Sequence, residues 1–140
     1  MGLDSRTLLR NVAYIVPPDT DTVFVCIGTN DIVLNPLFLD CETTLRHISR
    51  FVKDCKSALA VRRVVVCAVV RLPFVLDPLR KSTRLNKRLE EIYGEDFLDW
   101  TCDRSFRLFM AACTNDGIHP NASVYALWTK RIHDYMNEQQ

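Results

Sequence analysis

The chain has 140 residues, of which 48% are hydrophobic, and this length suits one compact domain and is too short for two. The 18 basic and 17 acidic residues leave a net charge of +1, which gives no long-range attraction for nucleic acid or for an acidic membrane surface. We therefore expect a single domain over residues 1–140, with no nucleic-acid partner and no membrane partner.

The cysteines and the first residues indicate whether the protein binds a cofactor and where in the cell it is located. The six cysteines form no Cys-x-x-Cys pair and no cluster with the histidines, so we expect no metal and no other cofactor. Several cysteines lie inside apolar runs, which favours a reduced, intracellular protein. The opening MGLDSRTLLR has neither the basic flank nor the long apolar core of a signal peptide. If this start is complete, the expected location is the cytoplasm.

Hydrophobic spacing in the first half of the chain alternates between helical and extended patterns. Residues 5–16 have helical spacing, and the PPDTD that follows is a stop signal. TVFVCIG, over residues 22–28, is a short β-branched run ending at a glycine, which predicts a buried strand. Residues 40–59 place charges opposite an apolar stripe, which predicts a helix packed on a sheet. That stripe consists of Cys41, Leu45, Ile48, Val52, Cys55 and Leu59.

The second half of the chain repeats this alternation. RRVVVCAVV, over residues 62–70, is apolar after its two arginines, as expected for a central parallel strand covered on both faces. Residues 79–94 predict a helix that ends at Gly94, a residue suited to a C-cap. FLDW, over residues 97–100, predicts a short strand, and residues 113–121 predict a loop. The two predicted helical stripes are Leu85, Leu89 and Ile92, and then Val124, Leu127, Trp128, Ile132 and Tyr135.

Helices and strands that alternate in this order predict right-handed crossovers and a mostly parallel sheet between two helical layers. In such sheets, ligands bind at the carboxyl ends of the strands. Two segments with suitable chemistry follow predicted strands. GTND, residues 28–31, supplies Asn30 as a hydrogen-bond donor, and DGIHP, residues 116–120, places Asp116 three residues before His119. That spacing lets a carboxylate hold an imidazole N–H.

Each of these two segments has an ordinary structural interpretation when it is taken alone. An asparagine in a loop usually makes an Asx-turn, and Asp-Gly is a common turn dipeptide. Together, an amide donor from one rim loop and a carboxylate–imidazole couple from another supply an oxyanion donor and an oriented base. The pair therefore favours a hydrolytic site over two unrelated turns.

VFVCIGTNDIV followed much later by DGIHPN resembles the SGNH, or GDSL-type, hydrolases. That resemblance implies a flavodoxin-like three-layer α/β/α fold and the cleavage of esters or related acyl groups. It implies that Asn30 is the oxyanion-hole asparagine, His119 the general base and Asp116 the carboxylate that orients the base. GLDSRTLLRNV then matches the segment that begins with the family's oxyanion glycine, which would be Gly2.

The chain departs from this family at the nucleophile. The family's Gly-Asp-Ser motif ends a first strand that lies upstream of the oxyanion glycine, and here only Met1 precedes Gly2. Ser5 matches the motif in letters, but the four residues before it are too few for a strand, so we expect Ser5 to cap or begin a helix. We therefore expect an N-terminally incomplete domain without its first strand. The exposed sheet edge that this leaves predicts a chain that is poorly soluble or that forms a homo-oligomer through this edge.

Two functions follow from this pattern. One is an SGNH-type esterase or acyl hydrolase for a small ester-like ligand, impaired because the catalytic serine motif is absent. The other is a non-catalytic module that binds a small ligand or a protein. Phe74, Val75 and Leu76 suit either an acyl pocket or simple packing. The basic residues of the 79–94 helix are followed by Glu90 and Glu91, which favours a solvated helix face.

Overall fold

The computed structural model of the chain describes residues 16–27, 41–69, 81–99 and 122–138. These residues belong to two compact units. The first unit spans residues 1–70 and 77–98, and the second spans residues 71–76 and 99–140. In the described part of the chain, no helix is long and apolar enough to cross a membrane. The expectation of a single domain, and that of a missing first strand, stay predictions.

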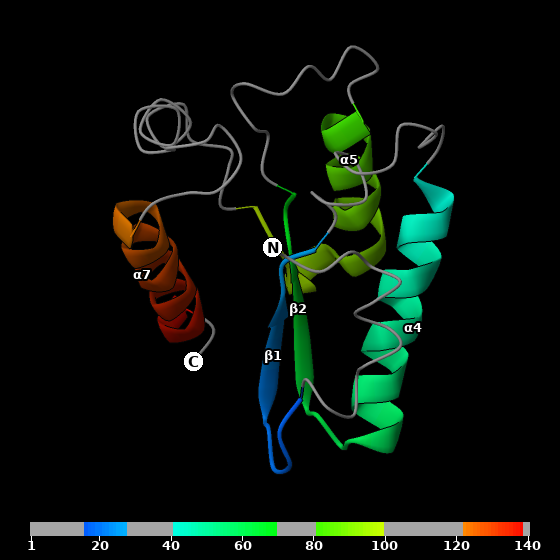
Figure 1. Ribbon diagram of the computed structural model, residues 1–140, viewed down its shortest axis with the longest axis horizontal. Helices are drawn as coiled ribbons and strands as arrows, with labels where there is room; N and C mark the ends of the chain where they lie inside the picture. The colour runs from blue at the N-terminus through cyan, green and yellow to red at the C-terminus, as the bar shows by residue number, and fades with distance from the viewer. Residues whose placement is uncertain (1–15, 28–40, 70–80, 100–121, 139–140) are drawn as a thin grey trace. The chain divides into compact units, whose positions relative to one another are not determined.

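The first unit contains a three-stranded parallel sheet in the order β1-β2-β3. Strand β1 covers Thr22–Val25, β2 covers Arg63–Cys67 and β3 covers Phe97–Leu98. Thr22 pairs with Arg63 and Val25 pairs with Val66, so β1 and β2 run side by side over their full shared length (Figure 1). All three strands were predicted from the sequence, and β2 is the central strand, as expected.

Strand β2 is buried on both of its faces. Val64 and Val66 point to one face, where they join two clusters of buried hydrophobic side chains. Val65 and Cys67 point to the opposite face, because side chains alternate along a strand, and both are 0% exposed. The unbroken apolar run in the sequence is explained by this burial on two sides.

Helices α4, Glu42–Ala58, and α5, Lys81–Tyr93, pack on the face of the sheet that carries Val64 and Val66 (Figure 1). Both helices were predicted. The stripe of α4 includes Phe51, which is only 1% exposed and which the predicted stripe omitted. Ile92, the third residue of the helical stripe in α5, is 46% exposed. Leu85, Leu89 and Tyr93 follow one another four residues apart and occupy the buried face, so Ile92 falls at its border.

Two residues in left-handed backbone conformations follow these helices. Gly94, with φ of +52°, comes directly after α5 and confirms the predicted C-cap. A 3₁₀ turn over Gly94–Asp96 then leads into β3. Ala60, with φ of +54°, plays the corresponding part after α4, although alanine adopts this conformation only with strain.

Ionic contacts join the amino ends of the three strands. Asp21 accepts two hydrogen bonds from the Arg62 guanidinium, at 2.9 and 3.0 Å, and its backbone oxygen accepts from the Arg62 and Arg63 amides. Arg63 in turn donates to the Asp96 carboxylate at 2.9 Å. The hydrogen bonds from Arg62 lower the pKa of Asp21 below its usual value. These pairs tie the start of β2 to the segments that lead into β1 and β3.

The second unit contains helix α7, Ala122–Glu138, which was also predicted. The residues of its predicted apolar stripe that can be assessed, Leu127, Trp128, Ile132 and Tyr135, are half-buried. The rings of Tyr125 and Trp128 lie with their centroids 6.1 Å apart, one turn from each other.

Candidate functional site

The residues that the sequence predicts as a catalytic site lie outside the described ranges. These are Gly2, Ser5, Asn30, Asp116 and His119, and the Phe74, Val75 and Leu76 of the candidate acyl pocket lie outside them as well. Their convergence stays a prediction. The described residues do define the rim of the sheet at the carboxyl ends of the strands, where that site is expected.

The carboxyl ends of the three strands lie at one rim because the strands are parallel and closely in register. Strand β1 ends at Val25, opposite Val66, and Cys67 at the end of β2 pairs with Leu98 at the end of β3. The Ala68 amide continues this pairing by donating to the Leu98 oxygen at 2.9 Å. In the sequence, Gly28 to Asp31 begin two residues after Cys26, so the predicted oxyanion segment follows directly on the described end of this rim.

An asparagine side chain from α5 fixes the backbone just beyond β2. Asn86 accepts a hydrogen bond from the Val69 amide through Oδ1 at 2.6 Å and donates through Nδ2 to the Val69 oxygen at 2.9 Å. The Asn86 side-chain amide thus makes the two backbone hydrogen bonds that a neighbouring strand would otherwise make with Val69. Val69 is only 3% exposed, so both of its backbone groups need a partner inside the protein. Asn86 therefore holds the exit of the central strand.

Two thiols face each other on the same rim. Cys26 directly follows β1 and Cys67 ends β2, and the register that pairs Val25 with Val66 places these two residues opposite one another. Cys26 is exposed and Cys67 is 0% exposed. A hydrogen bond between the two thiols raises the pKa of Cys26 above its ordinary value, and partial removal of solvent raises it further. Cys26 is therefore a thiol rather than a thiolate at neutral pH.

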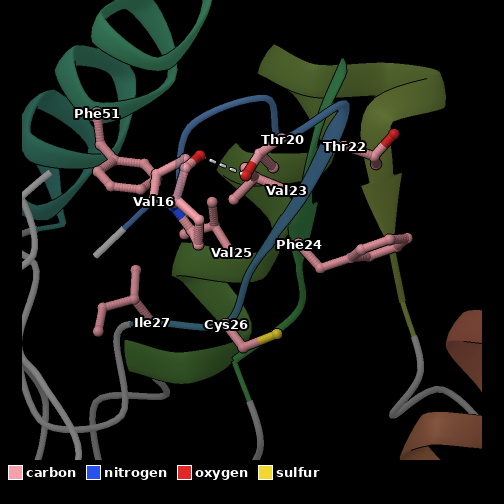
Figure 2. A pocket seen from close by; sticks show the side chains of 10 residues that line it. Val16, Thr20, Thr22, Val23, Phe24, Val25, Cys26, Ile27 and Phe51 are labelled. Atoms are coloured by element: carbon pink, nitrogen blue, oxygen red, sulfur yellow. Dashed lines mark hydrogen bonds between the residues drawn. The ribbon is translucent and has the colours of Figure 1, made fainter. Parts of the chain in front are cut away.

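A cavity of about 380 Å³ runs along β1 (Figure 2). Val23, Val25 and Ile27 line it from one face of the sheet, and Thr22, Phe24 and Cys26 line it from the other face. A space that touches both faces of a strand lies along its edge. Near the start of β1, Thr20 Oγ1 donates to the Pro17 oxygen at 2.6 Å and closes the turn beside the cavity.

The lining of this cavity suits a small and mostly apolar molecule. Its volume falls in the range of small-ligand sites. The polar groups on its described wall are the hydroxyls of Thr20 and Thr22 and the thiol of Cys26. The described lining includes Cys26 and Ile27, so the cavity extends to the carboxyl rim of the sheet.

The described residues contain no group of three or more histidine, cysteine, aspartate or glutamate side chains that would hold a metal ion. Among the basic residues of α5, Arg88 has acidic partners, because it donates to both Glu42 and Glu91 at 3.3 Å. The hydrogen bond with Glu91 and the charge of Glu42 raise the pKa of Arg88. The contacts of Arg88 therefore agree with the solvated helix face of mixed charge that the sequence favours.

Comparison with known proteins identifies the fold but not the family. No family model matches the chain, and no curated protein matches it. A solved structure from Streptococcus pneumonia, provisionally described as a platelet activating factor, is similar with a TM-score of 0.78 at 18% sequence identity. The similarity covers 95% of this chain and 68% of that one. This likeness and the parallel sheet confirm the predicted flavodoxin-like three-layer α/β/α fold class.

Proposed function

We propose that the chain is an SGNH-type acyl-hydrolase domain whose site lies at the carboxyl rim of the sheet and binds a small ester-like ligand. In this proposal His119 is the general base, Asp116 orients its imidazole, and Asn30 and the backbone amide of Gly2 stabilise the oxyanion. The nucleophile in this proposal is a serine hydroxyl. His119 would accept its proton, and the two oxyanion donors would stabilise the intermediate that its attack forms.

The observation that carries this proposal is the place where β1 ends, just before the GTND segment in the sequence. Strand β1 ends at Val25 on the carboxyl rim of a parallel sheet, and Gly28 to Asp31 follow in the sequence within a few residues. Ligands of parallel α/β proteins bind at that rim. The fold similarity to a solved structure over 95% of the chain is compatible with the same arrangement.

The 140-residue sequence contains no Gly-Asp-Ser. We therefore propose that this chain by itself hydrolyses esters slowly or not at all. The second candidate function, a non-catalytic module for a small ligand or a protein, is favoured by the same missing motif. It is also favoured by the largely apolar cavity along β1, whose described wall comes from the 16–27 segment and from Phe51.

Hydrolysis of p-nitrophenyl acetate tests the catalytic part of the proposal. Loss of a working general base lowers a rate by about 10²–10⁴-fold, whereas we expect His119→Ala to change this chain's rate by less than about twofold. A rate that is lost in both His119→Ala and Ser5→Ala would assign Ser5 as the nucleophile and contradict the proposed inactivity. Platelet activating factor appears in the description of the similar structure, so it is the second substrate to test.

The pairing of Asp116 with His119 is tested separately, by NMR titration of the histidine ring protons. A carboxylate beside an imidazole stabilises its charged form, so we expect Asp116→Asn to lower the pKa of His119 by about 1 pH unit. The signals of His47 and His133 serve as internal references, and Asp99→Asn is the matched control. An unchanged His119 titration in Asp116→Asn would show that the two residues are not a couple and would overturn the proposed site.

A further inference from the structure

Cys26 and Cys67 are a matched pair across two neighbouring strands. Val25 is the partner of Val66 in the parallel ladder, so the next residue on each strand is a cysteine. Val25 and Val66 both point to the helix-covered face, where they join the buried clusters. Because side chains alternate, Cys26 and Cys67 both point to the opposite face. Figure 2 shows the sulfur of Cys26 on the side of the neighbouring strand.

The spacing of neighbouring strands suits the Cα separation of a disulfide. Neighbouring strands are spaced about 4.8 Å apart, and cysteines that form disulfides have their Cα atoms about 4.4–6.8 Å apart. The hydrogen bond that raises the pKa of Cys26 has Cys67 as its partner, so the two thiols lie close together. Cys26 is exposed, whereas Cys67 is 0% exposed. Cys26 is therefore the more accessible residue of the two and the one we expect to meet a reagent first.

We propose that Cys26 and Cys67 are a redox-active pair that forms a reversible disulfide with a small disulfide oxidant such as oxidised glutathione. The Cys26 thiolate attacks one sulfur of the oxidant, forming a mixed disulfide and releasing one glutathione thiolate. The Cys67 thiolate then attacks the Cys26 sulfur, forming the Cys26–Cys67 bond and releasing the second glutathione. Two protein thiols are oxidised and one glutathione disulfide is reduced to two thiols, and the two protons lost by the protein thiols end on the released glutathione thiolates.

The other described cysteines do not share this geometry. Cys55 is 0% exposed and belongs to the cluster on the helix-covered face. Cys41 precedes α4, and the pKa of its thiol is raised mainly by loss of solvent. Neither has a cysteine opposite it in the strand register. They are therefore matched controls for a reaction that depends on the Cys26–Cys67 pairing.

The pH dependence of the reaction follows from the state of Cys26. Its raised pKa keeps it protonated near neutrality, and only the thiolate attacks a disulfide. We therefore expect the oxidation rate to rise on the order of tenfold per pH unit between about pH 7 and about pH 9. Reduction by dithiothreitol should restore both thiols.

The experiment uses the full, folded chain, reduced and then exposed to oxidised glutathione at about pH 8.5, where thiolate forms fastest without extreme conditions. Free thiols are blocked with N-ethylmaleimide after acid quenching, and the protein is digested with trypsin and Asp-N together. In the sequence, this digestion separates Cys26, in residues 21–30, from Cys41, and it separates Cys67, in residues 64–71, from Cys55. Mass spectrometry should detect these two peptides joined.

Variants decide between this pair and unspecific oxidation. Cys41→Ser and Cys55→Ser should form the linked peptides as the unmodified chain does. Cys26→Ala, at an exposed position, should remain folded by circular dichroism and leave Cys67 alkylated, because the buried thiol has lost its route to the oxidant. A Cys26–glutathione adduct that never resolves would overturn the proposal. Oxidation of Cys67 in Cys26→Ala, or a bond from Cys26 to Cys41, would overturn it as well.

Discussion

Replacement of Asn86 by alanine is the sharpest structural test of how the rim is held. The change removes both hydrogen bonds to Val69, at 2.6 and 2.9 Å, and leaves the amide and oxygen of a nearly buried residue without that partner. A net hydrogen bond contributes about 1 kcal/mol, and an unsatisfied buried group costs about 1–3 kcal/mol. Because Asn86 is half-buried, water can reach part of the gap. We expect the free energy of unfolding to fall by about 2–3 kcal/mol.

Urea unfolding followed by circular dichroism measures this loss, with Lys87→Ala as the control on the next, exposed residue of α5. That control should stay within about 0.5 kcal/mol of the unmodified chain. Asn86→Asp adds a second comparison, because its carboxylate still accepts from the Val69 amide but repels the Val69 oxygen. It should destabilise the protein near neutral pH and recover part of that loss when the carboxylate is protonated.

Hydrogen exchange at single amides locates the effect. If Asn86 holds the strand exit, the Val69 amide in Asn86→Ala should exchange about 30-fold faster, which corresponds to about 2 kcal/mol, before the core amide of Val65 responds. Equal acceleration at Val65 and Val69 would mean global destabilisation only. An unfolding free energy within about 0.5 kcal/mol of the unmodified chain would refute the reasoning, because the two contacts would then carry no net stability.

Further predictions concern the helix ends, the ionic contacts and the sheet edge. Ala60→Gly should raise the free energy of unfolding by about 0.5–1 kcal/mol, because glycine relieves the strain of a φ of +54°. Gly94→Ala should lower it by a similar amount through φ alone, since a Cβ there meets no atom within 4 Å. Asp21 has a lowered pKa, so its ionised carboxylate stabilises the fold at neutral pH. Asp21→Asn should therefore be less stable than the unmodified chain at neutral pH, and the difference should disappear as the pH falls below about 3.9. Urea titrations at several pH values measure this difference. Light scattering should give a mass above that of one chain, and a monomer mass at all concentrations would contradict the proposed edge pairing.

The sequence was sufficient for the helices and strands because their signals are local. An unbroken apolar run predicts a strand covered on both faces, and the burial of Val64 through Val69 confirms this for β2. The stripe of α4 and the glycine after α5 were likewise evident from residue spacing and type. Helical periodicity alone does not say where the buried face of a helix ends: Ile92 continues the spacing of Leu85 and Leu89 but is exposed, and Tyr93 packs against the core instead.

The contacts at the rim could not be predicted in the same way, because they join residues that are distant in the sequence. Asn86 reads as one polar residue on an amphipathic helix, and its role depends on how closely α5 approaches the end of β2. Cys26 and Cys67 read as two small hydrophobic residues inside apolar runs. Only the register of β1 on β2 reveals that they are opposite one another, and a shift of one residue would place them on different faces.

The position of Asn86 also separates the two candidate functions. A site at the carboxyl rim depends on the loops that leave the strand ends, and a misplacement of about 1 Å can lower a catalysed rate by about 100-fold. Asn86 and Val69 do not line the cavity along β1, whose described wall comes from residues 16–27 and from Phe51. Ligand binding in that cavity should therefore survive Asn86→Ala under conditions where the variant remains folded. Binding or turnover at the carboxyl rim should weaken under those same conditions. The single substitution Asn86→Ala therefore shows whether a ligand binds at the rim or in the cavity along β1.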